Sequence, residues 1–118
     1  MRRWHPLTLA RTQYFYETGQ GQRTHYIARR LSFHGNTLGT LGLAHHPVRR
    51  APYAAVLDSS TFHHVSPAYA ARFQQPGESE AGYVRRLADE LEAKFAALGG
   101  DTVIACACAR LGSARLTR

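Results

Sequence analysis

The segment at positions 78–100, ESEAGYVRRLADELEAKFAALGG, constrains the fold more than any other part of this sequence. Its apolar side chains Tyr83, Leu87, Leu91 and Phe95 recur every four residues, so they share one face of a helix. Charged side chains fall mostly on the other face, and a Gly-Gly pair ends the segment. This pattern predicts an amphipathic helix that packs its apolar stripe against a core.

Two short segments have the composition of strands. DTVIACACA at 101–109 follows the Gly-Gly pair directly, and RTHYIARR at 23–30 places Tyr, Ile and Ala in succession. Consecutive apolar residues are typical of a strand that is covered on both faces, as in a parallel sheet. The order of strand, helix, irregular stretch, helix and strand predicts an α/β fold with short parallel strands and flanking helices.

A first helix is predicted at 6–20, since it begins with a proline suited to a first turn and ends near a glycine. Its side chains Leu7, Ala10, Tyr14 and Phe15 fall near one helical face, so this helix is also expected to be amphipathic.

The middle of the chain gives weaker signals. TLGTLGLA at 37–44 is expected to form a helix that tolerates glycine, with Asn36 or Thr37 as its N-cap. The segments 45–57 and 63–80 contain prolines and no clear period, so they are expected to be extended or irregular.

The net charge of +7 raises the alternative of an Arg-rich module that binds nucleic acid or docks onto a partner. The charge is unevenly placed along the chain: residues 1–57 carry +7, residues 58–109 carry −3, and residues 110–118 carry +3. Arginine pairs are scattered instead of gathered on one element, whereas nucleic-acid surfaces usually have a local basic stripe. Nucleic acid is therefore not the expected partner.

The cysteines and histidines give no metal-binding spacing. Cys106 and Cys108 are the only cysteines, and at this separation on a strand their Cα atoms lie near the limit for a disulfide. None of the seven histidines has the spacing of a zinc motif. We expect small, buried cysteines and no metal site.

The stretch FHGNT at 33–37 places a glycine beside an aromatic, which often marks a close approach of the backbone to something flat or crowded. The segments 10–46, 49–53 and 66–105, and the spacing between them, resemble the large domain of class III aminotransferases, which use pyridoxal 5'-phosphate (PLP). The resemblance covers roughly residues 7–107 and implies part of a fold-type-I PLP-dependent transferase.

This resemblance assigns a cofactor-binding role to three residues. Phe33 would stack on the pyridine ring of PLP, His34 would complete the motif, and Gly35 would let the backbone turn tightly beside the cofactor. The alternative makes Phe33 an ordinary core side chain and His34 a surface residue.

The chain also departs from the family. The family has a glycine-serine phosphate cradle before the first helix, where this chain has MRRWHP, and an alanine-glutamate-proline-valine strand end, where this chain reads CARLGSARLTR. Lys94, the only lysine, lies in the amphipathic helix and does not match the family's cofactor-binding lysine. We expect residues 1–109 to be a partial large domain that lacks catalytic residues and is inactive alone, and residues 110–118 to be a disordered tail outside the family.

The resemblance further implies a function for the intact protein. Enzymes of this family transfer an amino group from a small amine or amino acid to an oxo acid, and they usually work as homodimers. No run of apolar residues is long enough to span a membrane, and the first residues lack a secretory signal, so a cytoplasmic location is expected.

Overall fold

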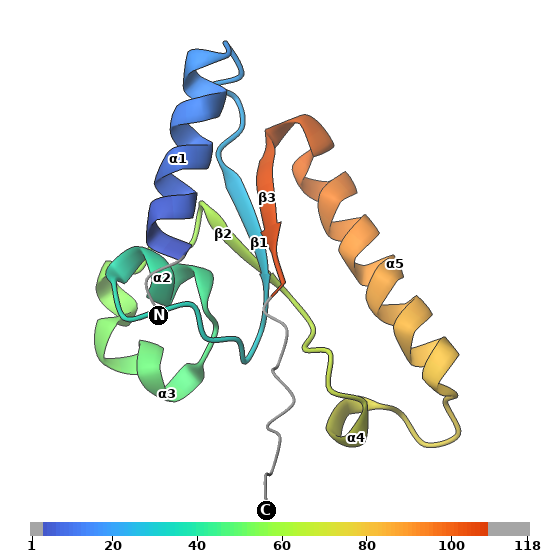
Figure 1. Cartoon of the computed structure of the whole chain (residues 1–118). Helices are drawn as coiled ribbons and strands as arrows, with labels where there is room; N and C mark the ends of the chain where they lie inside the picture. Colours follow the sequence, from blue (N-terminus) through green and yellow to red (C-terminus); the bar gives the residue numbers. More distant parts are fainter. Residues whose placement is uncertain (1–3, 109–118) are drawn as a thin grey trace, which may run out of the picture.

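The computed structural model describes residues 4–108, which form a parallel sheet between helices (Figure 1). The sheet has the order β2-β1-β3, with β1 at His25–Arg29, β2 at Phe62–Val65 and β3 at Val103–Ala107. Both pairings of the central strand are parallel, which confirms the predicted α/β fold with short parallel strands and flanking helices. The expected tail at 110–118 lies outside the described residues.

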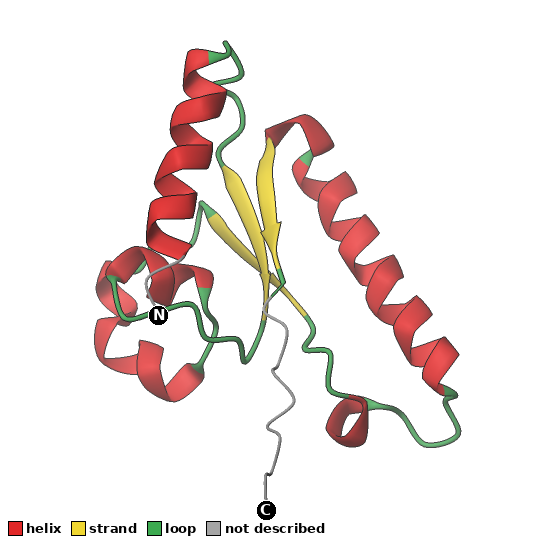
Figure 2. Ribbon diagram, viewed as in Figure 1, coloured by secondary structure: helices red, strands yellow, loops and turns green. Residues whose placement is uncertain are grey.

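The helices are α1 (Trp4–Glu17), α2 (Leu38–Leu43), α3 (Pro47–Arg50), α4 (Ala70–Phe73) and α5 (Glu80–Leu98), with 3-10 turns η1 (Ala51–Val56) and η2 (Gly100–Thr102). Figure 2 shows α1 and the short helices that follow β1 on one side of the sheet and α5 on the other. No helix in the part of the chain that the structure describes is long and apolar enough to cross a membrane.

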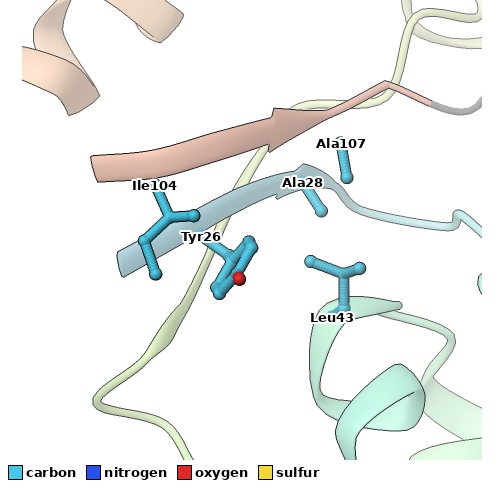
Figure 3. Close-up of a cluster of buried hydrophobic side chains, with 5 residues drawn as sticks. All are labelled: Tyr26, Ala28, Leu43, Ile104 and Ala107. Atoms are coloured by element: carbon cyan, nitrogen blue, oxygen red, sulfur yellow. The ribbon is translucent and has the colours of Figure 1, made fainter. Parts of the chain in front are cut away.

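One face of the sheet packs against α1 and α2. The core on this side consists of Tyr26, Ala28, Leu43, Ile104 and Ala107, drawn together in Figure 3. The face is not purely apolar, because the Tyr26 hydroxyl donates to the carbonyl oxygen of a residue in α1 at 2.8 Å. Burial of these side chains positions the carboxyl end of the central strand beside α2.

The other face of the sheet packs against α5. Ile27, Val65 and Val103 are buried there, and the partly buried Leu91 and Phe95 of α5 pack against them. These contacts confirm the apolar stripe that the sequence predicted for this helix. The central strand is therefore covered on both faces, as its run of consecutive apolar residues indicated.

The first helix differs from its prediction, since its apolar side chains do not form a buried face. Leu7 and Tyr14 are about half exposed, and only Phe15 packs against the core. The helix approaches the sheet through Thr8 and Thr12, which hydrogen bond to a buried tyrosine hydroxyl. The side of α1 that contacts the sheet carries Thr8, Thr12 and Phe15, so the neighbouring side with Leu7 and Tyr14 stays partly exposed.

The prediction of irregular structure at 45–57 is wrong, because α3 and η1 occupy most of this segment. Pro47 lies in the first turn of α3, and Pro52 lies in the first turn of η1. A proline in a first helical turn interrupts no intrahelical hydrogen bond, and its fixed φ suits a helix start. The two prolines thus begin helical turns here.

The prediction of irregular structure at 63–80 holds for 66–69 and 74–79 but is wrong for the rest, which contains most of β2 and all of α4. Two of the four residues of β2 are His63 and His64, so the strand has no hydropathy signal of its own. It exists because it pairs with β1, Ile27 lying opposite His63 and Ala28 opposite His64. Long-range pairing outweighs local composition in this strand.

The short helix α2 depends on its cap and on one glycine. Thr37 is its N-cap, which settles the choice between Asn36 and Thr37, and the Thr37 side chain accepts from the backbone N–H of Thr40 at 3.2 Å. Gly42 lies where α2 crosses β2, and a Cβ added there would come 2.7 Å from the Phe62 ring. The absence of a side chain at Gly42 allows this close approach.

His64 joins β2 to α2 and makes the stability of the chain depend on pH. Its Nε2–H faces the carbonyl oxygens of Gly42 at 3.1 Å and Leu43 at 3.0 Å. The pKa of His64 is lowered to about 4, mainly by burial and to a smaller extent by the nearby His45 and Arg50. The folded chain therefore holds this imidazole in its neutral form.

We expect the free energy of unfolding to fall as the pH decreases from about 6.5 to about 4, because only the unfolded state then protonates His64. A His64→Gln variant keeps an amide donor for the two carbonyls and cannot titrate in this range. Urea unfolding midpoints at about pH 7.5 and about pH 4.5 should therefore differ less for the variant than for the parent chain. An equal difference in both proteins would contradict this assignment.

Candidate cofactor site

The predicted cofactor-binding residues lie in the loop that leaves the carboxyl end of β1. Leu31 turns the chain with a φ of 60°, and its N–H donates to the carbonyl oxygen of His45 at 2.7 Å. The preceding residue, Arg30, forms a parallel bridge with the same histidine. The loop thus begins from a fixed position beside the segment that follows α2.

Phe33 is the exposed aromatic of this loop, with 39% of its surface accessible. The guanidinium carbon of Arg49 lies 4.7 Å from the centre of its ring, within the range of a cation–π interaction. Arg49 also donates to the Asn36 side-chain oxygen at 3.1 Å. The ring is therefore presented at the surface, with a cation held over it.

His34 is buried, with only 2% of its surface accessible. Burial lowers its pKa, so the imidazole is neutral in the folded chain at neutral pH. The alternative of a core Phe33 and a surface His34 is wrong on both counts, because the structure exposes the phenylalanine and buries the histidine.

Gly35 adopts a φ of +129°, which favours glycine over residues with a side chain. A Cβ at this position would also lie 3.0 Å from the Thr40 side-chain oxygen. That oxygen accepts from the backbone N–H of Thr37 at 2.9 Å, so it is already engaged in the cap of α2. Conformation and space both favour glycine at this position.

The structure brings Arg49 and Asn36 to the predicted residues, and neither was singled out for this site from the sequence. Arg49 is sixteen positions beyond Phe33, and in the sequence it is only one member of an arginine pair. The short helix α3 carries it back over the loop. The helix α3, which the sequence did not predict, creates this contact.

The described residues form a cavity that does not include this loop. It has a volume of about 250 Å³ and lies between α1 and the sheet, lined by residues that include Leu7, Arg11, Tyr26, Leu43 and Cys106. Phe33, His34 and Gly35 do not line it, so it is separate from the predicted site.

The two cysteines are thiols whose sulfur atoms lie 3.5 Å apart at the end of β3. The expectation of buried cysteines is wrong for Cys108, which is exposed, and is met only in part by Cys106, which is partly buried. Burial raises the pKa of the Cys106 thiol to about 12. Cys106 is therefore a weak nucleophile at neutral pH.

Comparisons with known proteins connect the chain to one class of enzymes. It is 41% identical over 106 residues to an aminotransferase of Gibberella zeae, a match that covers 88% of this chain and 21% of that protein. It is 42% identical over 93 residues to an uncharacterised aminotransferase of Schizosaccharomyces pombe, covering 79% and 20% of the two chains. No family model matches the chain.

Comparison with solved structures also finds transaminases. The omega transaminase from Pseudomonas jessenii in complex with PMP matches with a TM-score of 0.76 at 29% identity, over 84% of this chain and 22% of that chain. These matches give no support to the nucleic-acid alternative. The chain spans about one fifth of the length of the curated relatives it matches, and over that length it is similar in sequence and fold to a segment of the aminotransferases.

Proposed function

We propose that residues 33–35 form the ring-stacking part of a PLP site in a class III aminotransferase. The observation that carries this proposal is the placement of Phe33, an exposed aromatic at the carboxyl end of the central parallel strand. Ligands of open α/β sheets bind outside the carboxyl ends of the strands. The similar Pseudomonas jessenii enzyme was solved with PMP, which has the same pyridine ring and phosphate as PLP.

The residues of the loop suit the cofactor's ring. Phe33 offers an aromatic face, and stacking of aromatic rings contributes about 0.5–1.5 kcal/mol beyond burial. The buried His34 and the constrained Gly35 fix the backbone that directly follows Phe33. Arg49 adds a positive charge beside an anionic cofactor, although a stacked ligand must share the phenylalanine ring with it.

The described residues place no lysine at this loop. Lys94 is on α5, near enough to His63 to lower the pKa of that histidine, and so lies toward the amino end of the sheet. Residues 33–35 would therefore bind and orient the cofactor noncovalently. When bound, PLP would supply the electron sink for breaking bonds at the substrate's amine-bearing carbon.

The proposal extends to the whole protein by resemblance. Its substrates would be a small amine or amino acid and an oxo acid, its assembly a homodimer, and its location the cytoplasm. The alternative function is that of a non-catalytic partner, in which this segment would dock onto an intact, homologous aminotransferase.

A binding experiment with 4'-deoxypyridoxine phosphate tests the site. This analogue keeps the ring and phosphate but lacks the aldehyde, so it cannot react with Lys94 or with the N-terminal amine. We expect Phe33→Leu to weaken its binding to the full chain roughly 2- to 10-fold, because the aromatic stacking is lost. Phe33→Tyr should bind the analogue as the parent chain does. Isothermal titration calorimetry measures all three.

Phe73→Leu is the matched control. Phe73 is 37% exposed, almost the same as Phe33, but it lies on α4 away from the loop. Its substitution should leave binding unchanged. Equal weakening by both leucine variants, or none by Phe33→Leu, would remove the proposed role of Phe33.

A further inference from the structure

Three atoms converge at the amino end of the sheet, at the end opposite to Phe33. The Nδ1 atom of His25 lies 3.0 Å from the Nε2 atom of His63, and both face the carbonyl oxygen of Ser60, at 3.1 Å and 3.0 Å. The two imidazole rings meet nearly edge to face, at an interplanar angle of 74°. The three atoms thus form an almost equilateral triangle.

Hydrogen bonding cannot satisfy all three edges of this triangle. If both ring nitrogens carry a proton, each can donate to the Ser60 oxygen, but two N–H groups then face each other. If only His63 carries the proton, the lone pair of His25 faces a carbonyl oxygen. If only His25 carries it, the same repulsion falls on His63. A cation bound to all three atoms leaves no such conflict.

We propose that His25, His63 and the Ser60 carbonyl form one face of an octahedral or tetragonal site for a divalent transition metal such as Ni²⁺ or Cu²⁺. Adjacent corners of an octahedron lie ~3.0 Å apart when the metal–ligand bonds are about 2.1 Å, whereas tetrahedral corners lie ~3.4 Å apart. The observed edges of 3.0–3.1 Å match the octahedral value. Imidazole nitrogen with oxygen is the donor set that suits these two metals.

The loop that supplies the carbonyl is held in place without a metal. Asp58 accepts from both the backbone N–H and the hydroxyl of Ser60, each at 2.7 Å, and the Thr61 carbonyl accepts from the backbone N–H of Tyr26 at 2.9 Å. The two hydrogen bonds to Asp58 fix the turn, and the bond between Thr61 and Tyr26 joins the turn to the central strand. The three ligand atoms are therefore arranged before any metal binds.

The charges around the site act in opposite directions. Asp58 favours a positive charge at His63, whereas Lys94 of α5 opposes it. The hydrogen bonds of both histidines to Ser60 are solvent-exposed, so water can reach a bound metal and occupy its remaining positions. Such a site would bind a metal with moderate affinity and exchange its outer ligands readily.

Sequence spacing could not indicate this site, and the sequence had led us to expect no metal. In the part of the chain that the structure describes, no group of three or more histidine, cysteine or acidic side chains could hold a metal ion. The third ligand proposed here is a backbone carbonyl, which carries no residue signature. The two histidines come from different strands that only the sheet brings together.

Titration of the untagged full chain with Ni²⁺, followed by calorimetry, tests the proposal. We expect one Ni²⁺ per chain, with affinity reduced on the order of tenfold or more in His25→Gln and in His63→Gln, since loss of even an outer-shell partner of a ligand has about this effect. His46→Gln is the matched control, because His46 makes no side-chain capping bond and lies outside the triangle. Its affinity should equal that of the parent chain.

Electron paramagnetic resonance of the Cu²⁺-loaded parent chain gives a second test that needs no variant. The nitrogen hyperfine pattern should show two imidazole ligands. A pattern from one nitrogen or from more than two would overturn the proposal, as would unchanged Ni²⁺ affinity in both glutamine variants. Circular dichroism of the metal-free variants shows whether each has kept the fold.

Discussion

Ile27→Ala is expected to lower the free energy of unfolding by about 3–5 kcal/mol, within the range measured for large-to-small substitutions in protein cores. Ile27 is completely buried in the central strand and packs with Val65 and Val103 beneath α5. Truncation removes buried apolar surface and leaves a cavity between α5 and the central strand, which parallel pairing holds on both sides. A loss of this size is a large share of the total stability of a small domain.

Urea unfolding of the parent and variant chains measures the change through the midpoint and slope. Ile27→Val should lower stability by only about 0.5–1.5 kcal/mol, since it removes a single methylene. Val84→Ala, on the exposed side of α5 with 59% of its surface accessible, should have almost no effect. If the alanine variant at position 27 matched the valine variant, the burial of Ile27 between β1 and α5 would be wrong.

Gly42→Ala is expected to destabilise the chain by about 1–3 kcal/mol, although alanine is the better helix former. The new Cβ would lie 2.7 Å and 2.9 Å from two atoms of the Phe62 ring, so the ring or the helix must move. Gly39 is in the same helix, and a Cβ there would have no neighbour within 4 Å. Gly39→Ala should therefore stabilise the chain by about 0.5–1 kcal/mol.

The opposite signs of these two substitutions separate packing from helix propensity. Thermal or urea unfolding of both variants gives the comparison directly. In the background of Phe62→Leu, which removes the ring, the cost of Gly42→Ala should disappear in a double-mutant cycle. Stabilisation by alanine at both glycines would show that α2 does not approach β2 as closely as described.

Parts of the fold with a strong local signal could be predicted from the sequence. The helix α5 has a regular apolar stripe, and both β1 and β3 consist mainly of apolar residues in succession. For these elements the side chains that determine the local structure also make the core contacts. Local pattern and final burial therefore agree.

The strand β2 could not be predicted, because what stabilises it lies elsewhere in the chain. His63 and His64 resemble a polar loop until the edge of β1 provides hydrogen-bond partners. The site shows the same limit: the glycine at position 35 indicated its unusual backbone conformation, whereas the contact of Arg49 with Phe33 depends on the helix α3. A cation over an aromatic ring is a long-range contact with no local pattern.

The order of the strands along the chain determines how such a sheet can assemble. The central strand is the first to be synthesised, yet Tyr26 pairs with Phe62 and His25 with Val103, far later in the sequence. Pairing at such separations requires large loops to close, and the entropy lost on closure is not compensated until the strands form hydrogen bonds. Such pairing therefore slows folding. During synthesis, both edges of β1 are unpaired until β2 has emerged, and one edge stays unpaired until α5 and β3 have emerged. The interval before β3 arrives is therefore when this apolar strand is most open to association with other chains.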